Sequence, residues 1–162
     1  MNAHPESRAR KIAKFTNRSA NRRASAVAWS RLHARLLRVS KGRAIPRWFG
    51  APVVVLGTIG RKSGRRRETP VLALSHGRDL VVMAASAGTE APPAWWLNLQ
   101  AAGEATVLVR GERRAVRPRV SAGEEHDRLW PLYLAMYPAA EHYSRYTDRE
   151  LPLIVLEPKE QR

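Results

Sequence analysis

Residues 60–67 combine residue types that bind anions. The segment reads GRKSGRRR and follows an apolar, β-branched run that begins at Val53. Guanidinium groups bind phosphate and carboxylate oxygens two at a time, and glycines let the backbone approach a ligand closely. We therefore expect this basic turn to hold a ligand that carries a phosphate. A plain β-hairpin turn with solvated arginines is the alternative that the spacing leaves open.

The spacing differs from that of a Walker P-loop. That motif separates its first glycine from Gly-Lys-Ser/Thr by four residues and leads into a helix. Here Lys62 stands two residues after Gly60, and residues 69–74 have the pattern of a second strand. The expected anion site therefore lies in a strand-turn-strand unit.

Composition excludes several classes of site. The chain has 162 residues, 44% of them hydrophobic, which suits one domain with a core, and no cysteine. Disulfides, thiolate metal sites and cysteine nucleophiles are therefore excluded. The five histidines lack metal-ligand spacing, and we predict no metal site. No apolar stretch is long enough to cross a bilayer, and residues 1–10 lack the features of a secretory signal. We expect a cytoplasmic protein.

The net charge of +15 is concentrated in the first part of the chain. Residues 1–40 hold ten Lys/Arg and one acid, and residues 41–67 hold eight and no acid. Such a field attracts nucleic acid, acidic lipid or a polyanionic small molecule. The aromatic residues that could stack on bases lie mostly outside the basic runs, so nucleic acid is the weaker alternative.

Hydropathy patterns predict a mostly β protein with flanking helices, built as a small antiparallel barrel. Helices are expected at 92–102 and 123–136, with a break at Pro131. Residues 24–40 have the pattern of an amphipathic helix with arginines on one face. That helix could lie on an anionic membrane surface, but packing on its own domain is favoured. Strands are expected at 53–59, 69–75, 79–85, 105–110, 113–120 and 151–157.

Five segments occur in an order that is found in one family of proteins. They are the basic turn at 59–67, the small residues at 84–86, the Pro-x-Trp-x-x-Asn-Leu motif at 93–99, Met-Tyr-Pro at 136–138 followed by Tyr143, and Thr-Asp-Arg at 147–149 before a closing strand. This order resembles the deazaflavin-dependent nitroreductase family, of the F420H2-dependent quinone reductase type. The resemblance covers about residues 45–158.

The resemblance implies a fold and an activity. The fold is a split β-barrel of the flavin-reductase-like kind over residues 45–162, preceded by a basic arm at 1–44 that contains the amphipathic helix. The activity is hydride transfer from reduced coenzyme F420 to a quinone or another electron-poor small molecule, including nitro compounds. The alternatives are a basic nucleic-acid-binding protein, or a related barrel that binds FMN or heme. The location is cytoplasmic or peripheral on the inner face of the plasma membrane, through residues 24–40.

The resemblance also implies roles for particular residues. Ser86, Tyr137 and Tyr143 are the candidate catalytic residues, as proton donors, and Trp95, Tyr137, Ala140 and Tyr143 are expected to face the substrate. The expected coenzyme-binding residues are Val55, Leu56, Gly57, Arg61, Lys62, Ser63, Gly64, Arg65, Arg66, Arg67, Pro70, Val71, Leu72, Met83, Ala84, Ala85, Ser86, Ala87 and Asn98.

Besides Ile59, which stands where Thr is usual, three positions depart from the family pattern. Ala87 stands where a lysine is common, and Leu72 and Ala140 stand where aromatic residues are common. The coenzyme-binding segments therefore match the family pattern more closely than the residues expected to face the substrate. We expect quinone-like acceptors to be preferred over compact nitroheterocycles.

Overall fold

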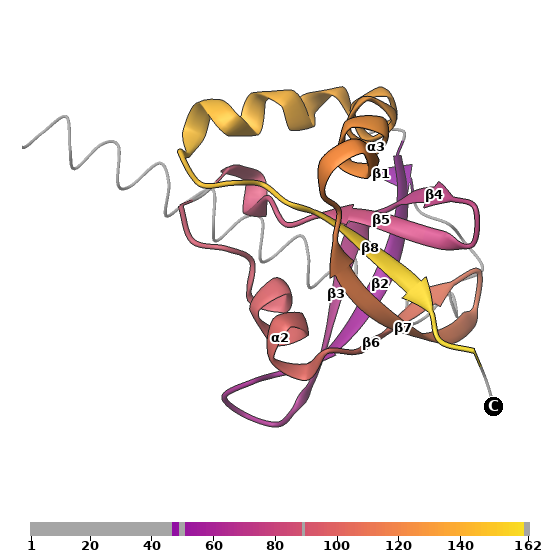
Figure 1. Cartoon of the computed structure of the whole chain (residues 1–162). Helices are drawn as coiled ribbons and strands as arrows, with labels where there is room; N and C mark the ends of the chain where they lie inside the picture. Colours follow the sequence, from indigo (N-terminus) through magenta and orange to yellow (C-terminus); the bar gives the residue numbers. More distant parts are fainter. Residues whose placement is uncertain (1–46, 49–50, 89, 161–162) are drawn as a thin grey trace, which may run out of the picture.

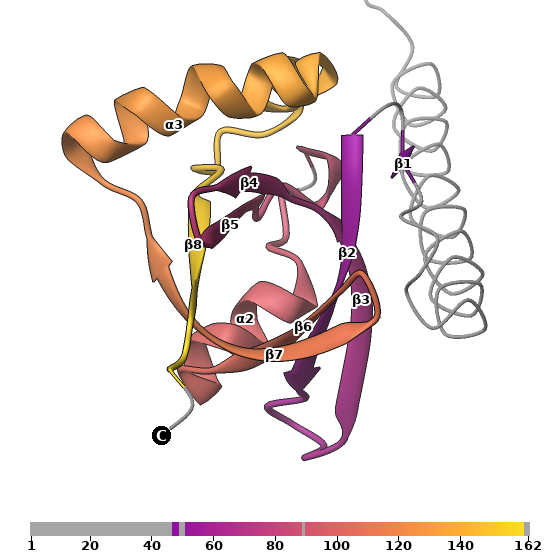
Figure 2. The same cartoon turned by 90° about the vertical axis from the view of Figure 1, so that its right-hand side faces the viewer.

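The structure, a computed structural model, describes residues 47–48, 51–88 and 90–160. Its centre is a single antiparallel sheet, which Figures 1 and 2 show from two sides. The strands are β1 (Arg47–Trp48), β2 (Ala51–Ile59), β3 (Arg66–Leu72), β4 (Leu74–His76), β5 (Asp79–Met83), β6 (Ala105–Val109), β7 (Glu112–Val120) and β8 (Leu153–Pro158).

The sheet curls into a barrel that stays open along one seam. The strand order is β1-β2-β6-β7-β8-β5-β4, and β3 pairs with β2. The curl brings β3 into contact with β5, although no pairing joins these two strands in the described sheet. The predicted fold class, a mostly β split barrel with flanking helices, is confirmed. The seam between β3 and β5 is called the opening below.

The barrel interior forms the first core cluster. Alternate residues of each strand point inward, so that Leu56, Val107 and Ile154 are almost fully buried together. Helix α2 (Ala94–Ala102) adds Trp95 and Leu99 to this cluster. Figure 2 shows α2 behind the curled sheet. Gly103 ends the helix in a left-handed conformation.

A second core cluster lies on the outer face of β5 and β8. Helix α3 (Gly123–Met136) and the 3-10 helix η2 (Pro138–Tyr146) cover this face, and Figure 1 shows them on one side of the sheet. Leu129 and Tyr133 of α3 pack there against Val81 and Val155. The cluster thereby connects the sheet to η2, which carries Tyr143.

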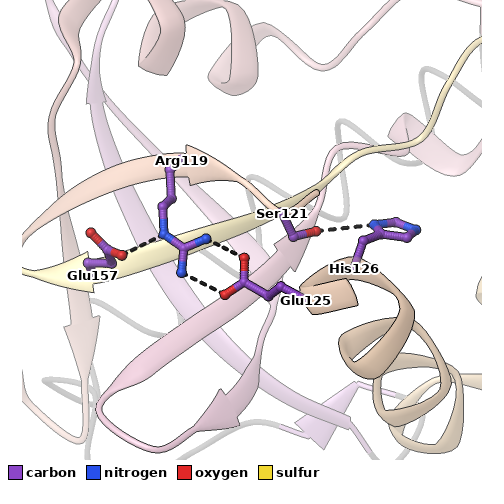
Figure 3. Close-up of polar contacts among 5 residues, drawn as sticks. All are labelled: Arg119, Ser121, Glu125, His126 and Glu157. Atoms are coloured by element: carbon purple, nitrogen blue, oxygen red, sulfur yellow. Dashed lines mark hydrogen bonds and ion pairs between the residues drawn. The ribbon is translucent and has the colours of Figure 1, made fainter. Parts of the chain in front are cut away.

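An ion-pair cluster holds the start of α3 against two strands. Figure 3 shows Arg119 of β7 between Glu157 of β8 and Glu125 of α3. The Arg119 Nε–Glu157 Oε1 distance is 2.5 Å, and both guanidinium NH groups of Arg119 reach Glu125. The hydrogen bond from Arg119 holds the pKa of Glu125 below its usual value. Next to this cluster, Ser121 Oγ lies 3.1 Å from His126 Nδ1.

Most of the predicted elements are confirmed, and two predictions are wrong. The helix at 123–136 is continuous through Pro131, whose side chain is exposed, while Leu129 and Tyr133 on either side of it are buried. The strand predicted at 69–75 is two strands that separate at Ala73, because β3 pairs with β2 whereas β4 pairs with β5. The predicted helix at 24–40 and the arm at 1–44 lie outside the described residues.

Candidate coenzyme site

The basic turn is a closed backbone loop. The Gly60 N–H donates to Arg65 O at 2.9 Å, and the N–H groups of Ser63 and Gly64 donate to Gly60 O at 3.1 and 2.8 Å. Gly64 has φ +63°, which suits glycine. A Cβ on Gly60 would lie 2.7 Å from Ser63 Oγ. The loop is therefore held in one shape by its own backbone hydrogen bonds, and a side chain at position 60 would have to displace the Ser63 hydroxyl.

The cationic side chains of the loop are exposed. Those of Arg61, Lys62, Arg65, Arg66 and Arg67 all lie at the surface. Arg66 is directed to the outer face of the sheet, where its NH2 donates to Thr106 Oγ1 at 3.2 Å and its Nε lies 3.8 Å from Glu68. The other four cations remain as candidates for binding an anionic ligand at the loop.

Asn98 of α2 fixes the loop to the barrel. Its side chain is only 5% exposed. Its Oδ1 accepts from Arg61 N at 3.1 Å and from Arg61 NH1 at 3.4 Å, while its Nδ2 donates to Thr58 Oγ1 at 3.3 Å. The amide is thus already used within the protein. Sequence reasoning placed Asn98 at the coenzyme but did not predict that Thr58 is its partner. The available signal was a hydroxyl residue at the end of an apolar strand.

Asn98→Ala is expected to weaken coenzyme binding by loosening the loop. Loss of these buried hydrogen bonds costs about 1–2 kcal/mol, so that the dissociation constant of F420 should rise about tenfold. Titration of coenzyme fluorescence measures this, with Gln100→Ala as a control because Gln100 is an exposed amide on the same helix. Equal affinities of the two variants would contradict the role given to Asn98.

The residues predicted to line the flat ring fall into two groups. Pro70 and Leu72 lie on the face of β3 that points away from the barrel interior, and Met83 and Ala85 lie at the end of β5 across the opening. Three others, Leu56, Val71 and Ala84, belong to the inner core cluster. Val55 packs in a third cluster with Leu72, and a Cβ on Gly57 would lie 2.5 Å from Thr106 Oγ1.

Strand β5 is followed by the short 3-10 helix η1 (Ser86–Gly88). Ser86 is half-buried and has φ +51°, a left-handed conformation that is costly for a non-glycine residue. Ala87 belongs to the same turn, and its side chain lies outside the described residues. The predicted ring-binding segment 83–87 is therefore a strand end followed by a strained turn.

Arg149 binds the backbone of this strand end. Its NH1 donates to Ala84 O at 3.0 Å and to Glu150 O at 2.9 Å, and its NH2 donates to Ala85 O at 3.0 Å. Burial lowers the pKa of Arg149. The sequence motif contained Arg149, but sequence reasoning gave it no role, because two of its three backbone partners lie more than 60 positions away.

The two candidate catalytic tyrosines contact each other. Tyr137 OH and Tyr143 OH are 2.8 Å apart, and their rings are tilted by 51°. Burial, and then the hydrogen bond to Tyr137, raise the pKa of Tyr143. The phenol of Tyr143 is therefore protonated at neutral pH. A 3-10 helix at 138–146 was not predicted, but it is the element that brings these phenols together.

Two predicted substrate residues are buried in the core clusters. Trp95 is 7% exposed in the barrel interior, and Ala140 is 1% exposed in the second cluster. Their role at a substrate wall stays a prediction. A larger side chain at Ala140 would have to displace its core neighbours.

Gly88 marks a close approach between η1 and η2. It has φ +73°, and a Cβ there would lie 2.8 Å from Tyr143 O and 3.1 Å from Tyr146 Cβ. The backbone that carries Ser86 therefore lies directly against the backbone that carries Tyr143. Three of the predicted site residues, Ser86, Tyr137 and Tyr143, are brought into one region by this contact.

Comparison with known proteins decides the family. The family model described as F420H(2)-dependent quinone reductase matches residues 29–158. The chain belongs to this family. Two proteins of Mycobacterium tuberculosis named as F420H(2)-dependent quinone reductases are each 30% identical to it. For Rv3178 the match spans 67% of this chain and 91% of that protein, and for Rv1261c it spans 78% and 87%.

Solved structures agree with the fold of this quinone reductase family member. A structure titled as an F420-H2 dependent reductase (FDR-A) has a TM-score of 0.59 and 27% identity, over 65% of this chain and 93% of that one. A heme binding protein from Mycobacterium smegmatis has a TM-score of 0.54, over 74% of this chain and 50% of that one. Because its identity is 18%, it shows a shared fold alone.

Proposed function

We propose that this protein is an oxidoreductase that passes a hydride from reduced coenzyme F420 to a quinone. The observation that carries the proposal is a closed, exposed basic loop that Asn98 ties to the barrel. The barrel has an opening beside Pro70 and Leu72 of β3 and Met83 and Ala85 at the end of β5. The family match and the names of the mycobacterial relatives support the coenzyme and the acceptor class. They give no support to the nucleic-acid, FMN or heme alternatives.

The residues present suit a ligand with an anionic tail and a flat ring. Arg61, Lys62, Arg65 and Arg67 would hold the phosphate and the acidic tail as point charges and guanidinium forks. Pro70, Leu72, Met83 and Ala85 would flank the ring at the opening. When it is bound, the reduced deazaflavin supplies the hydride. The protein supplies binding, orientation and exclusion of water.

The tyrosine pair would supply a proton to the product. A quinone that accepts a hydride needs one proton to become a hydroquinone. Tyr143 OH carries a proton at neutral pH and is hydrogen-bonded to Tyr137 OH. Ser86, whose hydroxyl lies on the turn packed against η2, is the second candidate donor. Tyr143→Phe would identify the donor by a fall in kcat with little change in the affinity for F420.

Quinone-like acceptors are expected to be reduced faster than compact nitroimidazoles. Leu72 is half-buried on β3 beside the opening, and it offers no hydrogen-bond donor to a nitro group. Leu72→Tyr adds a phenol there and should raise the nitroimidazole rate severalfold relative to the quinone rate. The measurement is the oxidation of F420H2, followed by absorbance, with each acceptor in turn.

Ala140→Tyr is the matched comparison for that experiment. Because Ala140 is buried, the added ring should lower thermal stability. A raised nitroimidazole rate would support the predicted place of Ala140 at the substrate wall, and an unchanged acceptor preference would contradict it. Faster reduction by the wild type of a nitroimidazole than of every quinone tried would show that the acceptor class is wrong.

Packing of residues 24–40 on their own domain is the favoured arrangement, and the alternative is a cytoplasmic protein that is peripheral on the membrane surface through this segment. The described residues include no helix of the length and apolarity needed to cross a bilayer. The arginines and the Trp29 side chain of the 24–40 segment have the pattern of a helix that binds anionic lipid. In the peripheral arrangement, deleting residues 1–40 should abolish co-sedimentation with anionic vesicles and preserve the reduction of soluble quinones. Unchanged vesicle binding after the deletion would exclude this role.

A further inference from the structure

Arg149 holds two successive carbonyl groups, and this is unusual for the end of a strand. In a β-strand, successive carbonyls point to opposite edges. Here the carbonyls of Ala84 and Ala85 both accept hydrogen bonds from one guanidinium. The chain therefore leaves the β conformation directly after Met83, where β5 ends. The next residue, Ser86, takes its left-handed conformation at this point.

The same clamp fixes the direction of two amide groups. A trans peptide places its N–H opposite its carbonyl, and the described residues contain no cis peptide. Because the carbonyls of Ala84 and Ala85 point toward Arg149, the N–H groups of Ala85 and Ser86 point away from it.

The direction away from Arg149 leads to the opening. Arg149 lies on the β8 side of the strand end, where it also binds Glu150 O and where Ala84 N donates to Pro152 O at 3.0 Å. The opposite edge of β5 pairs with β4 over Asp79–Val81, and β5 also contacts β3 at the opening. Two neighbouring N–H donors in this arrangement form a small electropositive concavity that suits an oxygen atom.

We propose that Arg149 is a positioning residue that turns the Ala85 and Ser86 N–H groups toward the opening, where they bind a carbonyl oxygen of the flat ring ligand. This inference rests on the proposed function, because it takes the ring of coenzyme F420 as that ligand. The positive charge of Arg149 polarises both peptides and strengthens the two donors. Lysine cannot replace arginine here, since one ammonium group does not form a fork across two carbonyls.

The test compares Arg149→Ala, Arg149→Lys and the control Arg128→Ala, which removes an exposed arginine on α3. Coenzyme binding is measured by fluorescence titration, and folding by circular dichroism and thermal unfolding. Loss of both donors should raise the dissociation constant about tenfold in Arg149→Ala. Arg149→Lys should weaken binding severalfold, and Arg128→Ala should bind as the wild type does. Millimolar guanidinium should partly restore binding to Arg149→Ala and should not affect the control.

The wild type gives a second, independent readout. In the ¹⁵N-labelled protein, the amide protons of Ala85 and Ser86 should move downfield and exchange more slowly when oxidised F420 is added. If Arg149→Ala does not fold, the inference is tested by the F420 affinity of Arg149→Lys and by these amide signals of the wild type.

Each result has one meaning. Failure of the wild type to bind F420 would overturn the proposed function. If the wild type binds F420, a folded Arg149→Ala with affinity within twofold of the wild type, or unmoved Ala85 and Ser86 amides, would overturn the inference about Arg149. If binding weakens in proportion to the loss of thermal stability and guanidinium does not restore it, Arg149 has a structural role only. That result would also overturn the inference about Arg149.

Discussion

Replacing Arg61, Lys62 and Arg67 together by alanine is expected to weaken F420 binding by about a hundred- to a thousandfold. A charge-assisted hydrogen bond contributes about 1.5–3 kcal/mol, which is about tenfold or more for each residue. All three side chains are exposed on a loop whose backbone is held by its own hydrogen bonds and by Asn98. The loss should therefore come from the removed charges and leave the fold unchanged.

A matched triple variant separates local binding from net charge. Arg78, Arg110 and Arg114 are exposed and line a cavity of about 270 Å³ between the β4–β5 turn and the β6–β7 hairpin. Figure 1 shows that turn on the side of the molecule opposite the loop between β2 and β3. Changing these three arginines to alanine removes the same charge and should alter affinity only a few-fold. Similar losses in the two triple variants would refute the placement of the anion at residues 60–67.

Gly88→Ala is expected to lower the free energy of unfolding by about 2–3 kcal/mol, because a non-glycine residue at φ +73° is strained and its Cβ meets the Tyr143 backbone. For a chain of this size the melting temperature should fall by about 5–10 °C. The same clash should push Tyr143 away from Ser86, so that kcat for quinone reduction falls as well.

Gly103→Ala is the control for this substitution. Gly103 has φ +66°, close to that of Gly88, but a Cβ there would have no atom within 4 Å. The control therefore carries the backbone strain without the clash, and differential scanning calorimetry compares the two. If the melting temperatures of the two variants are equal, η1 and η2 are not held together by the close approach at Gly88.

The sequence predicted helices and strands well where their boundaries depend on neighbouring residues in the chain. The apolar, β-branched run of β2, and Gly103 after α2, each depend on neighbours within a few residues, and the structure has these elements within two positions of the predicted bounds. The division of the predicted 69–75 strand at Ala73 was missed because it depends on a change of partner strand, from β2 to β5, which no local pattern shows. Pro131 did not break α3, because packing on the sheet outweighs one lost backbone hydrogen bond.

The candidate site was predictable in its residue types but not in its connections. The arginine loop was recognisable as a run of basic residues, and the family resemblance supplied the segments predicted to line the ring. The contacts of Asn98 with Thr58 and of Arg149 with Ala84 join residues 40 and 65 positions apart. Such contacts depend on the barrel closing in one register, which no local pattern specifies. For the same reason, the burial of Ala140 could not be foreseen.

The backbone hydrogen bonds inside residues 60–65 also determine how fast a ligand can be captured. A loop that already has its final shape needs no folding step on encounter, and its exposed cations set the encounter rate through long-range attraction. The observed association rate should then rise linearly with ligand concentration and fall as salt is added. The residence time of the bound ligand, which depends on short-range contacts, should change far less. In this protein, ionic strength would act on capture rather than on release.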